Sequence, residues 1–224
     1  MFTLGPGLRS GVVPDPSFGQ VQLLLHGDGA DNSTTFTDSS SFARTITGFS
    51  GAKLATEQSV FGGACLDFTD ASNGARIVTP SAAGLAMSGD FCLEFRLRMT
   101  STALNIYFLH GDGATSDIYV YTGSAGKLSF YVCNNLRADK CSVSADVWYA
   151  LCIDRSGLTT KLFLDGSQID TYTEASAQTM GASATWYVGS NPGLGGVSGG
   201  RCFIDELRLT AASRHQSAYT VDTE

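Results

Sequence analysis

Basic residues are scarce in this sequence: Lys and Arg together number 14 of 224 residues, against 21 Asp and Glu, for a formal net charge of -7. A surface that binds nucleic acid needs clustered Lys and Arg, and the few present here are scattered, so nucleic acid is not an expected partner. Charged residues make up only 16% and hydrophobic residues 43% of the chain. This composition excludes global disorder, because there is enough apolar surface to offset the chain entropy lost on folding.

Long apolar runs are also missing. No stretch approaches the roughly 20 apolar residues that a membrane-spanning helix needs, so membrane insertion is not expected. The first residues, MFTLGPGLRSGVVPDPSFG, have neither a basic start nor a long apolar stretch and do not resemble a secretory signal. We therefore expect the protein to be made in a cytoplasm and to leave it, if at all, by a route such as cell lysis.

The six cysteines include no C-x-x-C pair, which argues against a structural zinc site. Four cysteines lie inside strand-like runs, where a thiol acts as a small apolar filler: Cys65, Cys92, Cys152 and Cys202. The other two, Cys133 and Cys141, flank the segment NNLRADK, which is expected to be a loop. They form either a disulfide in an oxidising medium or two reduced thiols, and the absence of an export signal favours the thiols.

Residues 1–19 are expected to form an extended arm, because glycines and prolines recur through them and exclude a helix or a long strand. The arm is either a flexible tail or a segment that is held by the domain or by a neighbouring subunit. The remainder of the chain, residues 20–224, reads as one domain, since this length is ample for one closed hydrophobic core.

Hydrophobicity alternates with a period of two through most of the domain. In residues 91–99, FCLEFRLRM, five apolar side chains fall on one face and Cys, Glu and Arg on the other, which predicts a half-buried antiparallel strand. Other strands are expected at 21–25, 105–111, 117–123, 127–133, 148–154, 160–166, 167–173, 185–189 and 201–209. Regularly spaced short strands that end in Gly, Asp, Asn or Ser predict an all-β, two-sheet antiparallel β-sandwich or a barrel.

Turn signals support this reading. Asp165 and Gly166 separate two strand-like runs and supply the positive φ angles of a tight hairpin. Residues 81–89 and 209–215 could each hold one short helical turn. The pentapeptide HGDGA occurs twice, at 26–30 and 110–114, and it is either a convenient exit turn used twice or a trace of duplication. We favour the first reading, because nothing beyond the pentapeptide repeats.

Five segments, taken in order, resemble the laminin-G-like, concanavalin A-like lectin/glucanase jelly roll in the form often found in bacteriophage tail and virion proteins. They are VQLLLHGDGADNSTTFTDSS, FGGACLDF, GDFCLEFRLRM, WYALCIDRSGLTTKLFLDGSQI and RCFIDELRLTAASRH. The resemblance covers about residues 20–220 and implies a concanavalin A-like jelly roll. The resemblance is a better guide to the fold of this chain than to its activity, because members of the family have many different functions.

Catalytic residues of the kind that glucan-cleaving members carry are not evident. Those enzymes use an E-x-D-x-x-E strand, which puts paired carboxylates on one face. Here the strand 91–99 offers only Glu94, and Asp205 and Glu206 are adjacent and so face opposite ways. The protein is therefore expected not to be an enzyme, with a glycoside hydrolase as the less favoured alternative.

The resemblance also implies a structural calcium ion, since family members often hold one with the Asp of the closing strand and oxygens from early loops. The matching residues here are Asp28, Asp31, Asp38 and Asp205. Calcium prefers six to eight oxygen ligands, and Asp-rich loops can supply them. The alternative is that the first three only cap turns and that Asp205 pairs with Arg201 or Arg208.

Glycan binding needs flat aromatic faces with a few planar polar groups beside them. Alternation turns Tyr131 outward and puts Tyr119 and Tyr121 on one face. The full set of candidates is Tyr119, Tyr121, Tyr131, Asn134, Asn135, Arg137 and Trp186. The competing reading is that these aromatic residues are ordinary sandwich core.

The resemblance finally suggests a non-enzymatic virion protein, such as a tail fibre, an appendage or a capsid decoration, that presents a lectin-like module to bacterial surface glycans. Docking to other virion proteins or sister chains, in a homo-oligomer such as a trimer, is assigned to the arm through Phe2, Leu4 and Leu8. Purely structural decoration without any ligand is the alternative.

Overall fold

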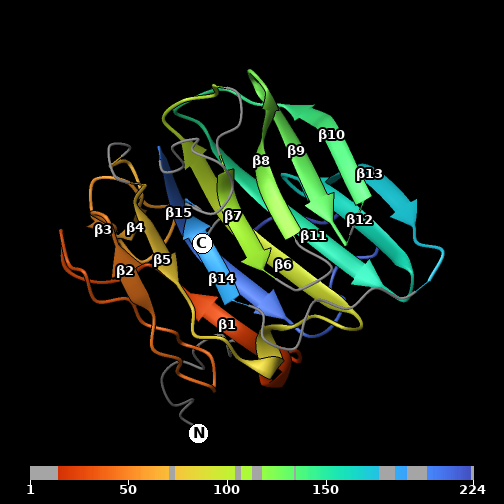
Figure 1. Cartoon of the computed structure of the whole chain (residues 1–224), viewed down its shortest axis with the longest axis horizontal. Helices are drawn as coiled ribbons and strands as arrows, with labels where there is room; N and C mark the ends of the chain where they lie inside the picture. The colour runs from red at the N-terminus through yellow and green to blue at the C-terminus, as the bar shows by residue number, and fades with distance from the viewer. Residues whose placement is uncertain are drawn as a thin grey trace, which may run out of the picture.

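Two antiparallel sheets, stacked face to face, form the molecule. The computed structural model describes residues 15–70, 74–103, 107–112, 118–133, 135–176, 185–190 and 201–222, and for 107–112 it describes the backbone. The eight-stranded sheet runs β13-β12-β11-β6-β15-β4-β3, with β1 also paired to β15, and the seven-stranded sheet runs β10-β9-β8-β7-β14-β5-β2. Figure 1 shows the two layers. The prediction of an all-β two-sheet sandwich is confirmed.

The strands of the eight-stranded sheet are β1 (Val21–Leu25), β3 (Lys53–Ala55), β4 (Cys65–Asp67), β6 (Phe91–Met99), β11 (Trp148–Ser156), β12 (Thr159–Leu164), β13 (Ser167–Thr173) and β15 (Cys202–Thr210). Those of the seven-stranded sheet are β2 (Thr47–Phe49), β5 (Arg76–Val78), β7 (Tyr107–Asp112), β8 (Ile118–Ser124), β9 (Lys127–Val132), β10 (Asn135–Ser142) and β14 (Thr185–Gly189). Two short 3-10 turns, Phe18–Gln20 and Ala83–Leu85, complete the described elements. No helix in the described part of the chain is long and apolar enough to cross a membrane.

The core lies between the sheets and follows the predicted alternation. In β6 the side chains of Phe91, Leu93, Phe95, Leu97 and Met99 are all buried. The same core cluster includes alternate side chains of β8 and β9 in the other sheet, and these are also fully buried. The period of two thus places one face of each central strand inside and leaves the other face for contacts outside the core.

The outer face of β6 is not simply exposed to solvent. Cys92 lies on that face and is nonetheless fully buried, together with Cys152 and Phe163, under Tyr219 of the C-terminal segment. Residues 211–222 therefore lie against the outside of the eight-stranded sheet after β15. The helical turn expected at 209–215 is absent from this described segment, where the strand continues to Thr210 and bends follow.

The segment expected as a loop, NNLRADK, is largely strand β10. It pairs with β9 from Asn135 opposite Val132 to Ser142 opposite Lys127, with an irregularity between Arg137 and Cys141. Side chains of β10 are mostly polar because the strand lies at the edge of its sheet. Cys133 and Cys141 are free thiols. Cys141 lies opposite Leu128, well along the hairpin from Cys133.

Two turn predictions have different outcomes. The hairpin between β12 and β13 has Asp165 at φ 49° and Gly166 at φ 75°, as the positive angles of a tight turn require. The first HGDGA copy forms the loop after β1, whereas His110–Asp112 of the second, the part of that copy that the structure describes, belong to β7. The prediction of an exit turn used twice is therefore wrong for these three residues.

The predicted arm falls mostly outside the described residues, including Phe2, Leu4 and Leu8. Its last part is described and is tied to the domain. Asp15 forms ion pairs with Arg208 on β15 and with Arg214 of the C-terminal segment. The chain therefore enters the domain along the outside of the eight-stranded sheet.

Candidate functional site

A row of aromatic residues crosses the outer face of the seven-stranded sheet. The register places Tyr131 on β9 opposite Tyr119 on β8, Tyr119 opposite His110 on β7, and His110 opposite Tyr187 on β14. Figure 1 shows these strands side by side. Four neighbouring strands span three strand spacings, roughly 14 Å. We call Tyr131, Tyr119 and Tyr187, together with the His110 backbone position between them, the tyrosine row.

The tyrosines of the row face away from the core. Ile118, Val120, Phe130 and Val132, which flank Tyr119 and Tyr131 in sequence, are fully buried, whereas the two tyrosines are half-buried. The outward orientation predicted for Tyr131 is thus confirmed, and the structure shows that Tyr119, for which the sequence predicted only a face shared with Tyr121, also faces outward. Tyr121 shares the face with Tyr119, two residues further along β8.

Tyr119 and Tyr131 form a cross-strand aromatic pair. Their ring centroids are 5.2 Å apart and the ring planes are tilted by 39°. Such pairing holds each ring in place, because both rings lose freedom against a neighbour on the same face. Leu136 lies opposite Tyr131 on β10 and is 57% exposed, which extends the apolar surface toward the sheet edge.

Arg137 lies away from the tyrosine row, contrary to the prediction. Its Nε and Nη2 donate to the two carboxylate oxygens of Asp170 at 2.6 and 2.9 Å, and its guanidinium lies 5.1 Å from the ring centroid of Tyr172. Asp170 and Tyr172 belong to β13 of the opposite sheet, so Arg137 joins the two sheets at their edge. The Asn135 side chain donates to the Cys133 carbonyl at 3.0 Å, and Asn134 is outside the described residues.

Trp186 is a core residue, so its prediction as a glycan contact is wrong. The side chain is 1% exposed, and its indole N–H donates to the Leu85 carbonyl at 3.1 Å. Its neighbour Tyr187 has the opposite orientation and belongs to the tyrosine row. The alternation in TWYVG could have predicted both orientations, because an inward Val188 places Trp186 inward and Tyr187 outward.

Asp38 organises a turn. Its Oδ1 accepts the backbone N–H of Leu24 and of Ser40, each at 3.0 Å, and its Oδ2 accepts that of Arg44 at 2.9 Å. The carboxylate is buried beside Arg44. The donors surrounding it are N–H groups, which repel a cation, so Asp38 does not fit the role of a calcium ligand.

Asp205 is held in the same manner. Oδ2 accepts the N–H of Val60 at 2.7 Å and of Phe61 at 3.1 Å, and Oδ1 accepts that of Glu206 at 3.0 Å. Burial raises the pKa of Asp205 to about 6, against the opposing effect of these hydrogen bonds. Backbone N–H groups, and not the ion pair with Arg201 or Arg208 considered above, therefore hold the Asp205 carboxylate.

The four predicted calcium ligands do not converge. Asp28 is an exposed residue beside Gly62, and Asp31 is exposed and accepts the Thr56 N–H at 3.2 Å. Within the described ranges, the one group of three or more potential ligands with donor atoms mutually within 4.8 Å contains none of these residues. The four do not fit one shared ion, and calcium binding itself stays a prediction.

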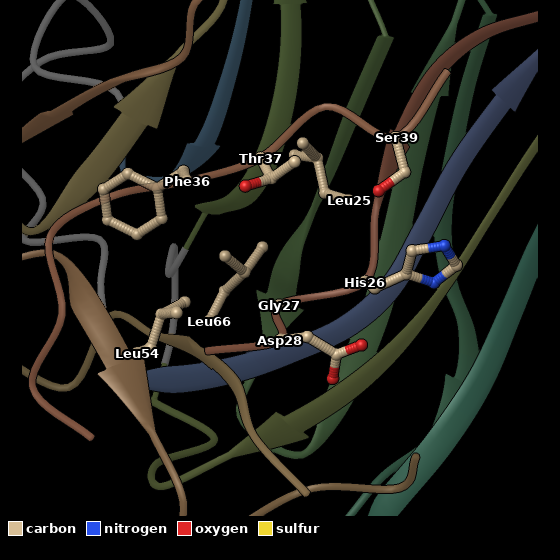
Figure 2. A pocket seen from close by; sticks show the side chains of 9 residues that line it. All are labelled: Leu25, His26, Gly27, Asp28, Phe36, Thr37, Ser39, Leu54 and Leu66. Atoms are coloured by element: carbon tan, nitrogen blue, oxygen red, sulfur yellow. The ribbon is translucent and has the colours of Figure 1, made fainter. Parts of the chain in front are cut away.

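The first HGDGA copy forms one side of a small pocket. Figure 2 shows His26 and Asp28 on one side and Phe36, Leu54 and Leu66 on the other. The volume is about 170 Å³, below the roughly 300–1,000 Å³ of pockets that hold small-molecule ligands. His26 Nδ1 lies 2.8 Å from a Glu206 oxygen, and this hydrogen bond raises the pKa of His26.

A larger open groove of about 760 Å³ lies on the outer face of the eight-stranded sheet, beneath the C-terminal segment. Two glutamates line it. Glu206 is paired with His26, and Glu94 is paired with Arg214 and with His215, whose Nε2 is 2.7 Å from Oε1. Burial acts to raise the pKa of Glu94, but the His215 hydrogen bond and the Arg214 charge outweigh it, so the pKa is lowered. Glu94 is thereby kept ionised and is unsuited to donate a proton to a leaving group.

The family model described as "Concanavalin A-like lectin/glucanases superfamily" matches residues 71–217. No curated protein matches the chain. Among solved structures, the binding domain of Paraclostridial Mosquitocidal Protein 1 superposes with a TM-score of 0.67 at 12% identity, covering 88% of this chain and 50% of that one. The botulinum neurotoxin serotype D binding domain gives 0.66 at 9% identity, covering 90% of this chain and 50% of that one.

A structure concerning botulinum neurotoxin type C, whose cell entry depends upon interaction with two ganglioside molecules, gives a TM-score of 0.63 at 13% identity, covering 89% of this chain and 49% of that one. The present chain thus spans about half the length of each of these structures. At these identities the likeness establishes the fold alone.

Proposed function

The chain belongs to the concanavalin A-like lectin/glucanases superfamily, and we propose that it is a non-enzymatic module that binds carbohydrate through the tyrosine row. The proposal names the outer face of the seven-stranded sheet as the binding surface and the apolar faces of sugar rings as what it contacts. Affinity per site is expected to be weak, with several copies giving avidity.

The observation that carries this proposal is the alignment of outward tyrosines on adjacent strands. Sugar rings present apolar C–H faces, and tyrosine offers a flat apolar ring with a hydroxyl at its tip. Tyr119 and Tyr131 hold each other at 5.2 Å, which lowers the side-chain entropy that ligand binding must remove. The structural neighbours support the proposal, since they are toxin binding domains and one is associated with gangliosides.

Catalysis is not part of this proposal. The two groove glutamates are each paired with a cation or a histidine, and a glycosidase needs one carboxyl group with a raised pKa as general acid. Release of new reducing ends from bacterial polysaccharide by the wild-type protein, and its loss in Glu94→Gln, would establish a hydrolase in place of a binding module.

We propose further that the module is carried on a bacteriophage virion, with residues 1–14 docking it to other virion proteins or to sister chains in a homo-oligomer such as a trimer. The support is the Gly/Pro-rich composition of this segment and the attachment of Asp15 to the domain, which fixes the point where the segment joins the domain. Deletion of residues 1–14 is expected to abolish incorporation into particles and to leave the domain folded. Normal incorporation of the truncated chain would remove the docking role.

Glycan binding is tested with Tyr119→Ala and Tyr131→Ala on an array of bacterial surface polysaccharides and ganglioside-type glycans. Loss of one ring contact is expected to cost about 1–2 kcal/mol, or roughly a 5- to 30-fold fall in affinity. Phe42→Ala is the matched control, because Phe42 is an aromatic residue 50% exposed and lies outside the strands. Equal binding by all variants would place the ligand elsewhere, and silence of the wild-type protein would favour purely structural decoration.

A further inference from the structure

Four potential metal ligands meet between the C-terminal segment and the eight-stranded sheet, and two of them, Glu94 and His215, also line the groove. They are Cys92 and Glu94 of β6, Cys152 of β11 and His215, and their donor atoms all lie within 4.8 Å of one another. The glycan proposal uses none of them. Both cysteines are fully buried, whereas Glu94 and His215 are partly buried.

Strand register brings three of the four together. Cys152 lies directly opposite Glu94, and Cys92 lies opposite Asp154, all on the outer face of the eight-stranded sheet. The Cys92 and Cys152 sulfur atoms are 3.5 Å apart. Two thiols and a carboxylate are therefore held by two paired strands in the interior of the sheet, β6 and β11.

The fourth ligand, His215, is positioned by Asp154. This buried carboxylate accepts the backbone N–H groups of Arg214 at 2.6 Å and His215 at 2.8 Å, together with the Ser213 hydroxyl at 2.6 Å. The imidazole of His215 stacks on Tyr219, with ring centroids 3.7 Å apart and an angle of 13°. Its Nε2 then points at Glu94 Oε1, 2.7 Å away.

We propose that Cys92, Glu94, Cys152 and His215 bind one zinc ion in a tetrahedral structural site that fastens the C-terminal segment to the sheet. Two thiolates, one imidazole and one carboxylate are a zinc donor set, and their softness disfavours calcium and magnesium. Tetrahedral zinc requires sulfur atoms about 3.8 Å apart and nitrogen and oxygen ligands about 3.3 Å apart. The present separations of 3.5 and 2.7 Å each differ from these values by less than about 1 Å. Each sulfur atom lies within 4.8 Å of the nitrogen and oxygen atoms and moves closer to them when zinc binds.

The charges around the site balance when zinc binds. Two thiolates and the Glu94 carboxylate carry three negative charges against two on zinc, and the Arg214 guanidinium paired with Glu94 supplies the remaining positive charge. Burial, more than any other cause, raises the pKa of Cys92 and of Cys152. The two thiols therefore hold their protons without metal, and zinc binding forms two Zn–S bonds while releasing two protons to solvent.

The test uses the full chain, purified under reducing conditions, stripped with a chelator and titrated with ZnCl₂. We expect one zinc ion per chain, a rise in melting temperature on binding, and thiolate-to-metal charge-transfer absorption when Co²⁺ replaces zinc. His215→Gln leaves the buried thiols in place and is expected to weaken zinc binding at least 10-fold, whereas Cys152→Ser abolishes it.

Cys141→Ser is the matched control, because Cys141 is a free thiol on the other sheet, and it should bind zinc as the wild-type does. Failure to bind one equivalent of zinc would overturn the proposal, as would unchanged binding by both His215→Gln and Cys152→Ser. A disulfide between Cys92 and Cys152, found by non-reducing peptide mapping of protein made in a cytoplasm, would also overturn it. None of these results bears on glycan binding, so the two proposals fail separately.

Discussion

The Asp154 carboxylate accepts a hydrogen bond from the backbone N–H of His215 at 2.8 Å, across a sequence separation of 61 residues. It also accepts from Arg214, Ser213 and the Gln216 side chain, so one buried carboxylate organises the whole turn after β15. The C-terminal segment is therefore fastened to the eight-stranded sheet by a polar anchor as well as by the apolar contact of Tyr219.

Replacing this anchor should release the segment. We expect Asp154→Ala to lower the free energy of unfolding by about 2–4 kcal/mol, because several buried donors lose their acceptor at once. Urea denaturation measures the loss, and hydrogen exchange should show faster exchange at the amides of Arg214 and His215. Unchanged exchange at these two amides would contradict the anchoring role.

Arg155 and Glu174 form a buried ion pair, with Nη2 to Oε2 at 3.0 Å and side chains 1% and 2% exposed. We expect Glu174→Gln to lower the free energy of unfolding by about 3–5 kcal/mol, because it leaves the Arg155 charge buried beside a neutral group. The double variant Arg155→Met/Glu174→Met should recover part of this loss, since no charge then remains buried.

Asp146→Asn is the control for that pair. Arg98 and Asp146 are 3.0 Å apart, but Asp146 is 64% exposed, so the expected loss is below about 1 kcal/mol. Equal losses in the urea midpoints of Glu174→Gln and Asp146→Asn would show that burial does not set the strength of these pairs.

Asp205 should be sensitive to both substitution and pH. Asp205→Asn is expected to cost about 1–3 kcal/mol, because the amide nitrogen would face either the N–H groups of Val60 and Phe61 or the N–H of Glu206. The folded pKa of about 6 lies above the unfolded value near 3.9. The protonated carboxyl therefore stabilises the fold fully below about pH 4, and this contribution is lost as the pH rises through 6. Denaturation at pH 4 and pH 7 should show the gap between the wild-type and Asp205→Asn narrowing at the higher pH.

The pair formed by His26 and Glu206 should also make the folded state less stable as the pH rises. The Glu206 hydrogen bond raises the folded pKa of His26, with smaller contributions from Asp28 and Asp205. The pair therefore stabilises the fold below about pH 6.5 and loses this contribution as the pH rises through the higher folded pKa. Since His26 is 38% exposed, we expect no more than about 1 kcal/mol. An NMR titration should show a lower pKa for His26 in Glu206→Gln, and an identical titration curve would refute the pairing.

Much of the sandwich was predictable because its long strands alternate. The period of two in 91–99 and in 127–133 identifies the strand, its buried face and the outward position of Tyr131 without any tertiary information. The three-residue strands β2, β3, β4 and β5 were not predicted individually, because three residues carry too little periodicity. Strand β10 was missed because its polar side chains resemble a loop until the pairing with β9 is known.

Alternation along each strand therefore determined the architecture, the core and the tyrosines that face outward, since these depend on near neighbours in sequence. Only the tertiary structure decided what lies over the outside of the eight-stranded sheet. Cys92 meets Cys152 across 60 residues and Glu94 meets His215 across 121, separations at which no local spacing such as C-x-x-C can reveal a shared site. The physical reason is that long-range contacts bring these side chains together. The register of β6 with β11 places Cys92 near Cys152, and the hydrogen bonds of Asp154 place His215 near Glu94.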